Sequence, residues 1–152
     1  MNIHETIDLA TQMEEKMSEC YRELSQLCSD EPISNELKEL SREEIDHMNL
    51  LITGKYYVSE APDLFELNSD REFEMKKGLN RVITLIDRIK NKKVSLAEAI
   101  NDTFELEKLF EQLHLNTILE VKDASLEKLF KALSRGDKEH KKRLIEVLKK
   151  VY

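Results

Sequence analysis

The sequence predicts an all-α protein, an antiparallel four-helix bundle whose two halves are joined by a long crossover with a helix of its own. Only 3 Gly and 2 Pro occur among the 152 residues, too few for the many turns of a sandwich or barrel of short strands. In four long segments, apolar residues recur at alternating steps of four and three, which is typical of the inward stripe of a bundle helix. The length suits a single domain, taken here as residues 1–152.

The first two helices are expected to form a hairpin within residues 3–54. Between them, Asp30 or Glu31 lies near the start of the second helix and Pro32 falls in its first turn, where proline is favoured. Gly54 is a residue that can end the second helix. Because the turn is short, the two helices should run antiparallel.

The last two helices are expected to form a second hairpin within residues 95–151. Ser95 and Glu98 have the spacing of a capping box that opens the third bundle helix. Residues 122–125 then form a short turn into the fourth. This hairpin is also expected to be antiparallel.

Residues 55–94 form the predicted crossover between the hairpins. The stretch 56–63 has a loop-like composition, and a helix with one apolar face follows, although Gly78 weakens its start. The residues of that face are Leu79, Val82, Ile83, Leu85, Ile86 and Ile89. A connection of this length can run along the whole bundle, so the second and third bundle helices should be parallel.

Charge and composition exclude several classes of protein. The 31 Asp and Glu outnumber the 24 Lys and Arg, giving a net charge of −7, and this argues against general binding to nucleic acid or anionic membranes. No run approaches 18 apolar residues, and the first residues do not resemble a signal peptide. Cys20 and Cys28 do not form a disulfide framework, so a cytoplasmic location is expected.

Six polar residues interrupt the apolar stripes near the middle of their helices: Glu14, Glu44, His47, Glu107, Asp137 and His140. Burying several carboxylates together is costly, because each loses water and they repel one another. One or two polar residues in a stripe can fix helix register, but six are not explained in this way. A bound cation would relieve the charge problem for all of them.

Hairpin geometry and an internal repeat bring these residues together. Glu14 and Glu44 are centred on residue 29, and Glu107 and Asp137 on residue 122, so each pair should lie at one level of the bundle. An offset of 93 residues maps the first hairpin onto the second, and four of the eight residues in 40–47 are identical to those in 133–140. A carboxylate and a histidine three residues apart share a helix face and can bind one ion.

The donor set favours particular metals. Four carboxylates and two imidazoles suit iron or manganese better than a structural zinc site, which prefers Cys and His ligands. Four negative charges also balance two divalent cations. The donor set therefore favours two ions of iron or manganese, with zinc possible.

This pattern resembles the ferritin-like di-iron carboxylate bundles, and within them the rubrerythrins, over most of the chain. The resemblance implies that Glu14 and Glu107 are single ligands, whereas Glu44 with His47 and Asp137 with His140 are the paired ligands. Bridging carboxylates would be drawn from these four acids. Tyr21, seven residues after Glu14, also matches the first-helix signature.

The chain departs from the rubrerythrin pattern in three respects. Asp137 stands where the family usually has Glu, and Phe104 stands where rubrerythrins have an additional Glu linked to peroxide chemistry. The paired Cys-x-x-Cys motifs of a rubredoxin-like domain are missing, so an external electron donor protein is expected. These departures weaken the peroxidase interpretation more than the metal site.

Glu111 and His114 form a further Glu-x-x-His pair, which must be weighed as an alternative pair of metal ligands. Glu111 should face Leu133, about 6 Å along the bundle axis from the site, and His114 aligns with Tyr21 in the repeat. We interpret both as core residues or as residues that support the ligands. Tyr21 is likewise interpreted as a core tyrosine with the option of a hydrogen bond to a ligand carboxylate.

The leading hypothesis is a dinuclear non-haem iron protein, an oxidoreductase that reacts with peroxide or O2. Its role would be peroxide reduction or ferrous oxidation, in oxidative-stress defence or iron handling. The alternatives are an iron carrier or sensor without turnover, a bundle stabilised by a structural metal, and a helical interaction protein without metal. No nucleic acid or membrane partner is expected, and the apolar face of the crossover helix is compatible with a homodimer.

Overall fold

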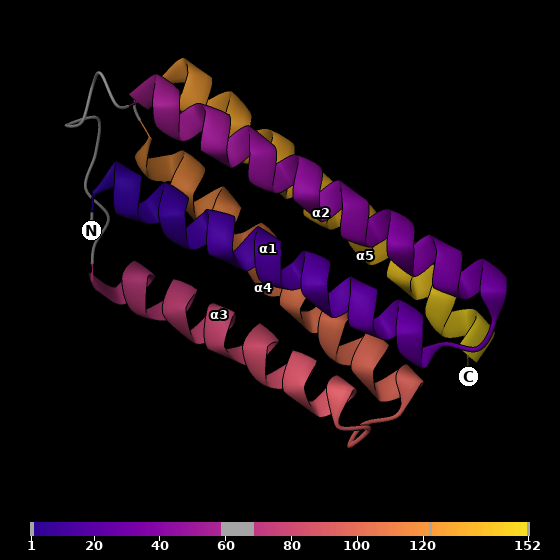
Figure 1. Cartoon of the computed structure of the whole chain (residues 1–152). Coiled ribbons are helices and arrows are strands. Elements are labelled where there is room, and N and C mark those ends of the chain that lie inside the picture. Colours follow the sequence, from indigo (N-terminus) through magenta and orange to yellow (C-terminus); the bar gives the residue numbers. More distant parts are fainter. Residues whose placement is uncertain (1, 59–68, 122, 152) are drawn as a thin grey trace.

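The computed structural model describes residues 2–58, 69–121 and 123–151 and contains five helices in them (Figure 1). They are α1 (Ile3–Leu27), α2 (Glu31–Val58), α3 (Ser69–Lys90), α4 (Leu96–Glu120) and α5 (Ala124–Val151). The predicted all-α bundle with an extra crossover helix is confirmed.

The helices α1, α2, α5 and α4 form the four-helix bundle, in that order around its axis. The pairs α1–α2 and α4–α5 pack as antiparallel hairpins, and α2–α5 and α1–α4 close the ring. Helix α3 packs outside the ring against α1 and α4 and runs back along the bundle (Figure 1). As predicted, α2 and α4 therefore point in the same direction.

Side chains accept hydrogen bonds from backbone N–H groups at the starts of three helices. The backbone N–H of Ile33 donates to Asp30 Oδ1 at 3.0 Å, so Asp30 caps α2. At α4, the backbone N–H of Glu98 donates to Ser95 Oγ at 3.2 Å. A full capping box, formed by Asn2 and Glu5, opens α1.

The prediction that Gly54 ends the second bundle helix is wrong, because α2 continues through it to Val58. The glycines of the described residues have no positive φ, so the need for this one is steric. A Cβ at Gly54 would lie 2.6 Å from Leu129 Cδ2 of α5. Residues 56–58 are helical rather than loop-like, and residues 59–63 of the predicted loop lie outside the described part of the chain.

The core follows the predicted stripes. Side chains such as Ile7, Leu37 and Phe130 are fully buried, and Val82 and Ile86 bury the face of α3. Ile83 is an exception to the predicted crossover face, being 43% exposed. Among the helices of the described residues, none has the length and apolar composition needed to cross a membrane.

Candidate metal centre

The six polar side chains that interrupt the stripes meet in the middle of the four-helix bundle. Glu14 comes from α1, Glu44 and His47 from α2, Glu107 from α4, and Asp137 and His140 from α5. All are buried except His47, whose side chain is 13% exposed. The 4,3 spacing dictates this result, because it turns each of these residues toward the bundle axis.

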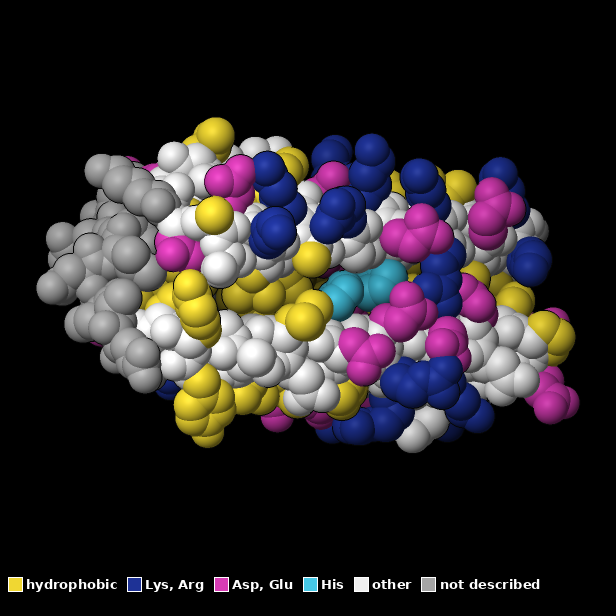
Figure 2. Space-filling view, turned by 90° about the horizontal axis from the view of Figure 1, so that it is seen from above, with side chains coloured by type: hydrophobic (Ala, Val, Ile, Leu, Met, Phe, Trp, Pro, Cys, Tyr) yellow, Lys and Arg dark blue, Asp and Glu magenta, His cyan; other side chains and the backbone are white. Residues whose placement is uncertain are grey.

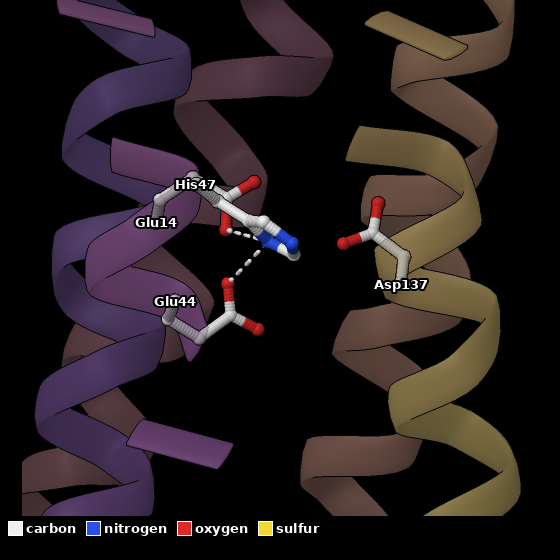
Figure 3. A group of neighbouring side chains, drawn as sticks. All are labelled: Glu14, Glu44, His47 and Asp137. Carbon is white, nitrogen blue, oxygen red and sulfur yellow. Dashed lines mark hydrogen bonds and ion pairs between the residues drawn. The ribbon is translucent and has the colours of Figure 1, made fainter. Parts of the chain in front are cut away.

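One group of possible ligands is made by Glu14, Glu44, His47 and Asp137 (Figure 3). Each offers one ligand atom, and these atoms all lie within 4.8 Å of one another. His47 Nδ1 is 3.3 Å from Glu44 Oε2 and 3.7 Å from Glu14 Oε2. Asp137 faces them from α5 on the opposite side of the bundle (Figure 3).

A second group is made by Glu44, Glu107 and His140. His140 Nδ1 lies 2.7 Å from Glu44 Oε1 and 3.3 Å from Glu107 Oε1. Glu44 therefore belongs to both groups, and each group has one histidine that presents its Nδ1 atom. The His47 and His140 rings, which occupy equivalent positions of the repeat, are stacked with centroids 5.4 Å apart.

Two of the four carboxyl groups have raised pKa values. Burial, followed by the charge of Glu44, raises the pKa of Glu14 from its usual value to about 7. Burial, followed by the charges of Glu14 and Glu107, raises the pKa of Asp137 well above its usual range. Each shift shows that the folded protein disfavours additional negative charge at that carboxyl group.

The pKa values of His47 and His140 are also raised, and for a histidine this favours the charged form. Burial alone would lower the pKa of His47, but hydrogen bonds to Glu14 and Glu44 raise it to about 10. For His140, burial is outweighed by Glu44 and Glu107, and its pKa rises to about 11. The carboxylates therefore favour the protonated form of both imidazoles, and a metal ion that binds these nitrogens would displace the protons.

Unsatisfied atoms provide a test of whether a metal fits. Among the described residues, the buried atoms Glu14 Oε1 and Glu107 Oε2 have no hydrogen-bond partner. Native proteins rarely bury such atoms without a partner, an ordered water or an ion. With carboxylate oxygens and imidazole nitrogens as donors, these residues fit a divalent transition metal.

Of the three residues interpreted as possible supports for the ligands, Tyr21 and His114 contact them. The Tyr21 hydroxyl donates to Glu107 Oε1 at 2.6 Å. His114 Nδ1 is 2.7 Å from Asp137 Oδ2, and burial lowers the pKa of His114 to about 4. Glu111 is placed differently, because it forms an ion pair with Lys141 at 2.5 Å.

Sequence reasoning missed Gly136. A Cβ at this position would lie 2.3 Å from His47 Cε1 and 2.5 Å from His47 Nε2, so the absence of a side chain makes room for the imidazole ring. The repeat offers a hint of this role, because Gly136 stands at the position that Glu43 occupies in the first hairpin. Histidine side chains are visible in a hollow of the surface, with hydrophobic side chains beside them (Figure 2).

Comparisons with protein-family models, curated proteins and solved structures give no match. The function is therefore argued from the site. The buried carboxylate and histidine groups could hold a metal ion, and the all-helical bundle is compatible with a ferritin-like fold.

Proposed function

We propose that this protein is a dinuclear non-haem iron protein of the rubrerythrin or ferritin-like type that reacts with peroxide or O2. The observation that carries the proposal is the sharing of Glu44 by two ligand groups, each with its own histidine. A shared carboxylate can bridge two ions. Four buried carboxylates, Glu14, Glu44, Glu107 and Asp137, also match the charge of two divalent cations.

The ligand side chains have separable tasks in this proposal. Glu44 would hold the pair together, while His47 with Glu14 and His140 with Glu107 would hold one ion each. Tyr21 fixes Glu107 by its hydrogen bond, and such supporting contacts orient a ligand. Bound iron would supply a centre that can change oxidation state and polarise a bound oxidant.

His47 is the one partly exposed side chain among the six candidate ligands. This side chain is 13% exposed, and the hollow where histidines are visible is partly lined by hydrophobic side chains (Figure 2). In this proposal, O2 or peroxide would enter from this partly exposed side. An external electron donor protein would be needed for reductive turnover, and a homodimer is compatible with the proposal.

The second candidate is a metal-binding module, an iron carrier or sensor or a bundle with a structural metal, without catalytic turnover. Phe104 supports it, because this partly buried aromatic side chain packs against the core where rubrerythrins have a carboxylate. A carrier would bind iron at the same ligands but would not consume oxidant in proportion to a supplied reductant.

An anaerobic Fe(II) titration followed by addition of O2 or peroxide tests the proposal. We expect about two ions per chain, by analogy with carboxylate-bridged pairs, and oxidation of the bound iron with consumption of the oxidant. Glu44→Gln should lose both ions. Glu39→Gln, on the same helix but at a partly exposed side chain paired with Arg42, is the matched control and should bind as the wild type does.

The outcomes separate the two candidates. Binding of iron without repeated consumption of oxidant in the presence of a reductant would favour the carrier or structural role. Failure to bind iron, manganese or zinc would contradict both candidates.

A further inference from the structure

His114 occupies a position in the metal centre that supporting hydrogen bonds do not fully explain. It comes from α4 and is 1% exposed. Its Nδ1 atom is 2.7 Å from Asp137 Oδ2, and its Nε2 atom faces Glu14 Oε1 at 3.7 Å. Among the described residues, neither Nε2 nor Glu14 Oε1 has a hydrogen-bond partner.

The distance between these two atoms is informative. At 3.7 Å, they are too far apart for a hydrogen bond, and burying both without partners is costly. Two ligand atoms that each lie about 2.0–2.2 Å from one ion are separated by roughly 3–3.5 Å. The observed separation is therefore close to that of two ligands of the same ion and differs by a few tenths of an ångström.

Asp137 has the position of a carboxylate that orients a metal-binding histidine. Histidines that bind a metal through one ring nitrogen usually donate the other N–H to a carboxylate or carbonyl. The short contact between His114 Nδ1 and Asp137 Oδ2 has this arrangement. It would place the proton on Nδ1 and leave the lone pair of Nε2 directed at Glu14.

The internal repeat shows that this position differs between the two halves. His114 aligns with Tyr21 under the offset of 93 residues. Tyr21 supports Glu107 by donating a hydroxyl hydrogen bond at 2.6 Å. At the equivalent place, His114 brings a nitrogen that can ligate a metal toward Glu14, the counterpart of Glu107.

We infer that His114 is a further metal ligand, binding through Nε2 the ion that Glu14 holds, with Asp137 Oδ2 orienting its ring. The two ions would then have unequal ligand sets: two histidines on the Glu14 side and one on the Glu107 side. This inference rests on the proposed dinuclear site.

Nitrogen-15 NMR of the histidine rings tests the inference directly, with Zn(II) as a diamagnetic probe. The chain has four histidines, and single substitutions assign their ring signals. We expect His47, His140 and His114 to acquire a metal-bound nitrogen on loading, with His114 bound through Nε2 and protonated at Nδ1. His4, which lies 3.4 Å from the Val58 carbonyl oxygen, should not change and is the internal control.

Other outcomes overturn the inference in distinguishable ways. If His47 and His140 bind metal but His114 Nε2 does not, the inference fails and the dinuclear site stands. If none of the histidines binds metal, both fail. In a chelator competition, His114→Gln should lower the affinity for one of the two ions by at least about tenfold and leave the affinity for the other nearly unchanged. Wild-type affinity for both ions in this variant would contradict the inference. The NMR test on the wild-type chain decides even if this variant does not fold.

Discussion

Substitution of Gly136 by alanine should weaken metal binding without destabilising the metal-free fold. Gly136 lies within α5, and its missing side chain leaves room for the His47 ring of α2. An added Cβ would lie 2.3 Å from His47 Cε1, whereas ordinary contact begins near 3.4 Å. The ring must therefore retreat by roughly 1 Å, which is well outside the tolerance of about 0.2 Å for a metal–ligand distance.

The substitution should lower the affinity for metal but slightly raise the stability of the metal-free fold. Loss of His47 as a ligand should weaken its ion by at least about 10- to 100-fold, or about 1.4–2.8 kcal/mol. Replacing a helix-interior glycine by alanine stabilises a helix by up to about 1 kcal/mol. Because the His47 side chain is partly exposed, the ring can move outward, and the metal-free variant should be as stable as the wild type or slightly more so.

Chelator competition and urea unfolding of the metal-free protein measure these two effects separately. Gly54→Ala is the matched control, because Gly54 lies at the same α2–α5 interface but its Cβ would meet the flexible end of Leu129. This control should retain wild-type metal affinity. Wild-type affinity for both ions in Gly136→Ala would refute the reasoning that the position of His47 depends on this glycine.

Three further predictions follow from the site. Tyr21→Phe removes the donor to Glu107 and should weaken one ion by about 10- to 100-fold in a chelator competition; unchanged affinity for both ions would contradict the supporting role. The pKa values of His47 and His140, raised to about 10 and 11, leave both imidazoles protonated at neutral pH without metal. Because each imidazole must lose a proton to bind, the affinity of each ion should rise at least about tenfold per pH unit from pH 6 to 9, and more steeply where Glu14 or Asp137 must also lose a proton; calorimetry in buffers of different ionisation enthalpy should detect the released protons, and their absence would count against histidine ligation. At a free metal concentration of 100 times the dissociation constant, each ion should add about 2.7 kcal/mol to the free energy of unfolding; identical melting with and without metal would contradict binding to the folded state.

The sequence was sufficient to predict the helices and the convergence of the six polar residues. Helical period and hairpin symmetry are local properties, so the level of Glu14 and Glu44 in the bundle follows from counting residues about the turn. The repeat added independent support, because Glu44 with His47 and Asp137 with His140 preserve the same spacing. Which acid belongs to both ligand groups was left open, and the structure places Glu44 there.

Features that depend on the rotation and approach of neighbouring helices could not be predicted in this way. Glycine is common at helix ends, so the sequence predicts a helix end at Gly54, whereas the actual constraint on this residue is its closeness to Leu129 of another helix. Gly136 has the same kind of constraint from His47. For His114, the helical period predicts an inward position but not that one ring nitrogen lies beside Asp137 and the other faces Glu14.

The most direct test of the central claim is anomalous diffraction from crystals loaded with Fe(II), recorded above and below the iron absorption edge. We predict two anomalous peaks inside the four-helix bundle, both within bonding distance of Glu44, one beside His47 and the other beside His140. Peaks only at surface carboxylates, or none in crystals soaked with iron, would contradict a dinuclear metal centre in this protein.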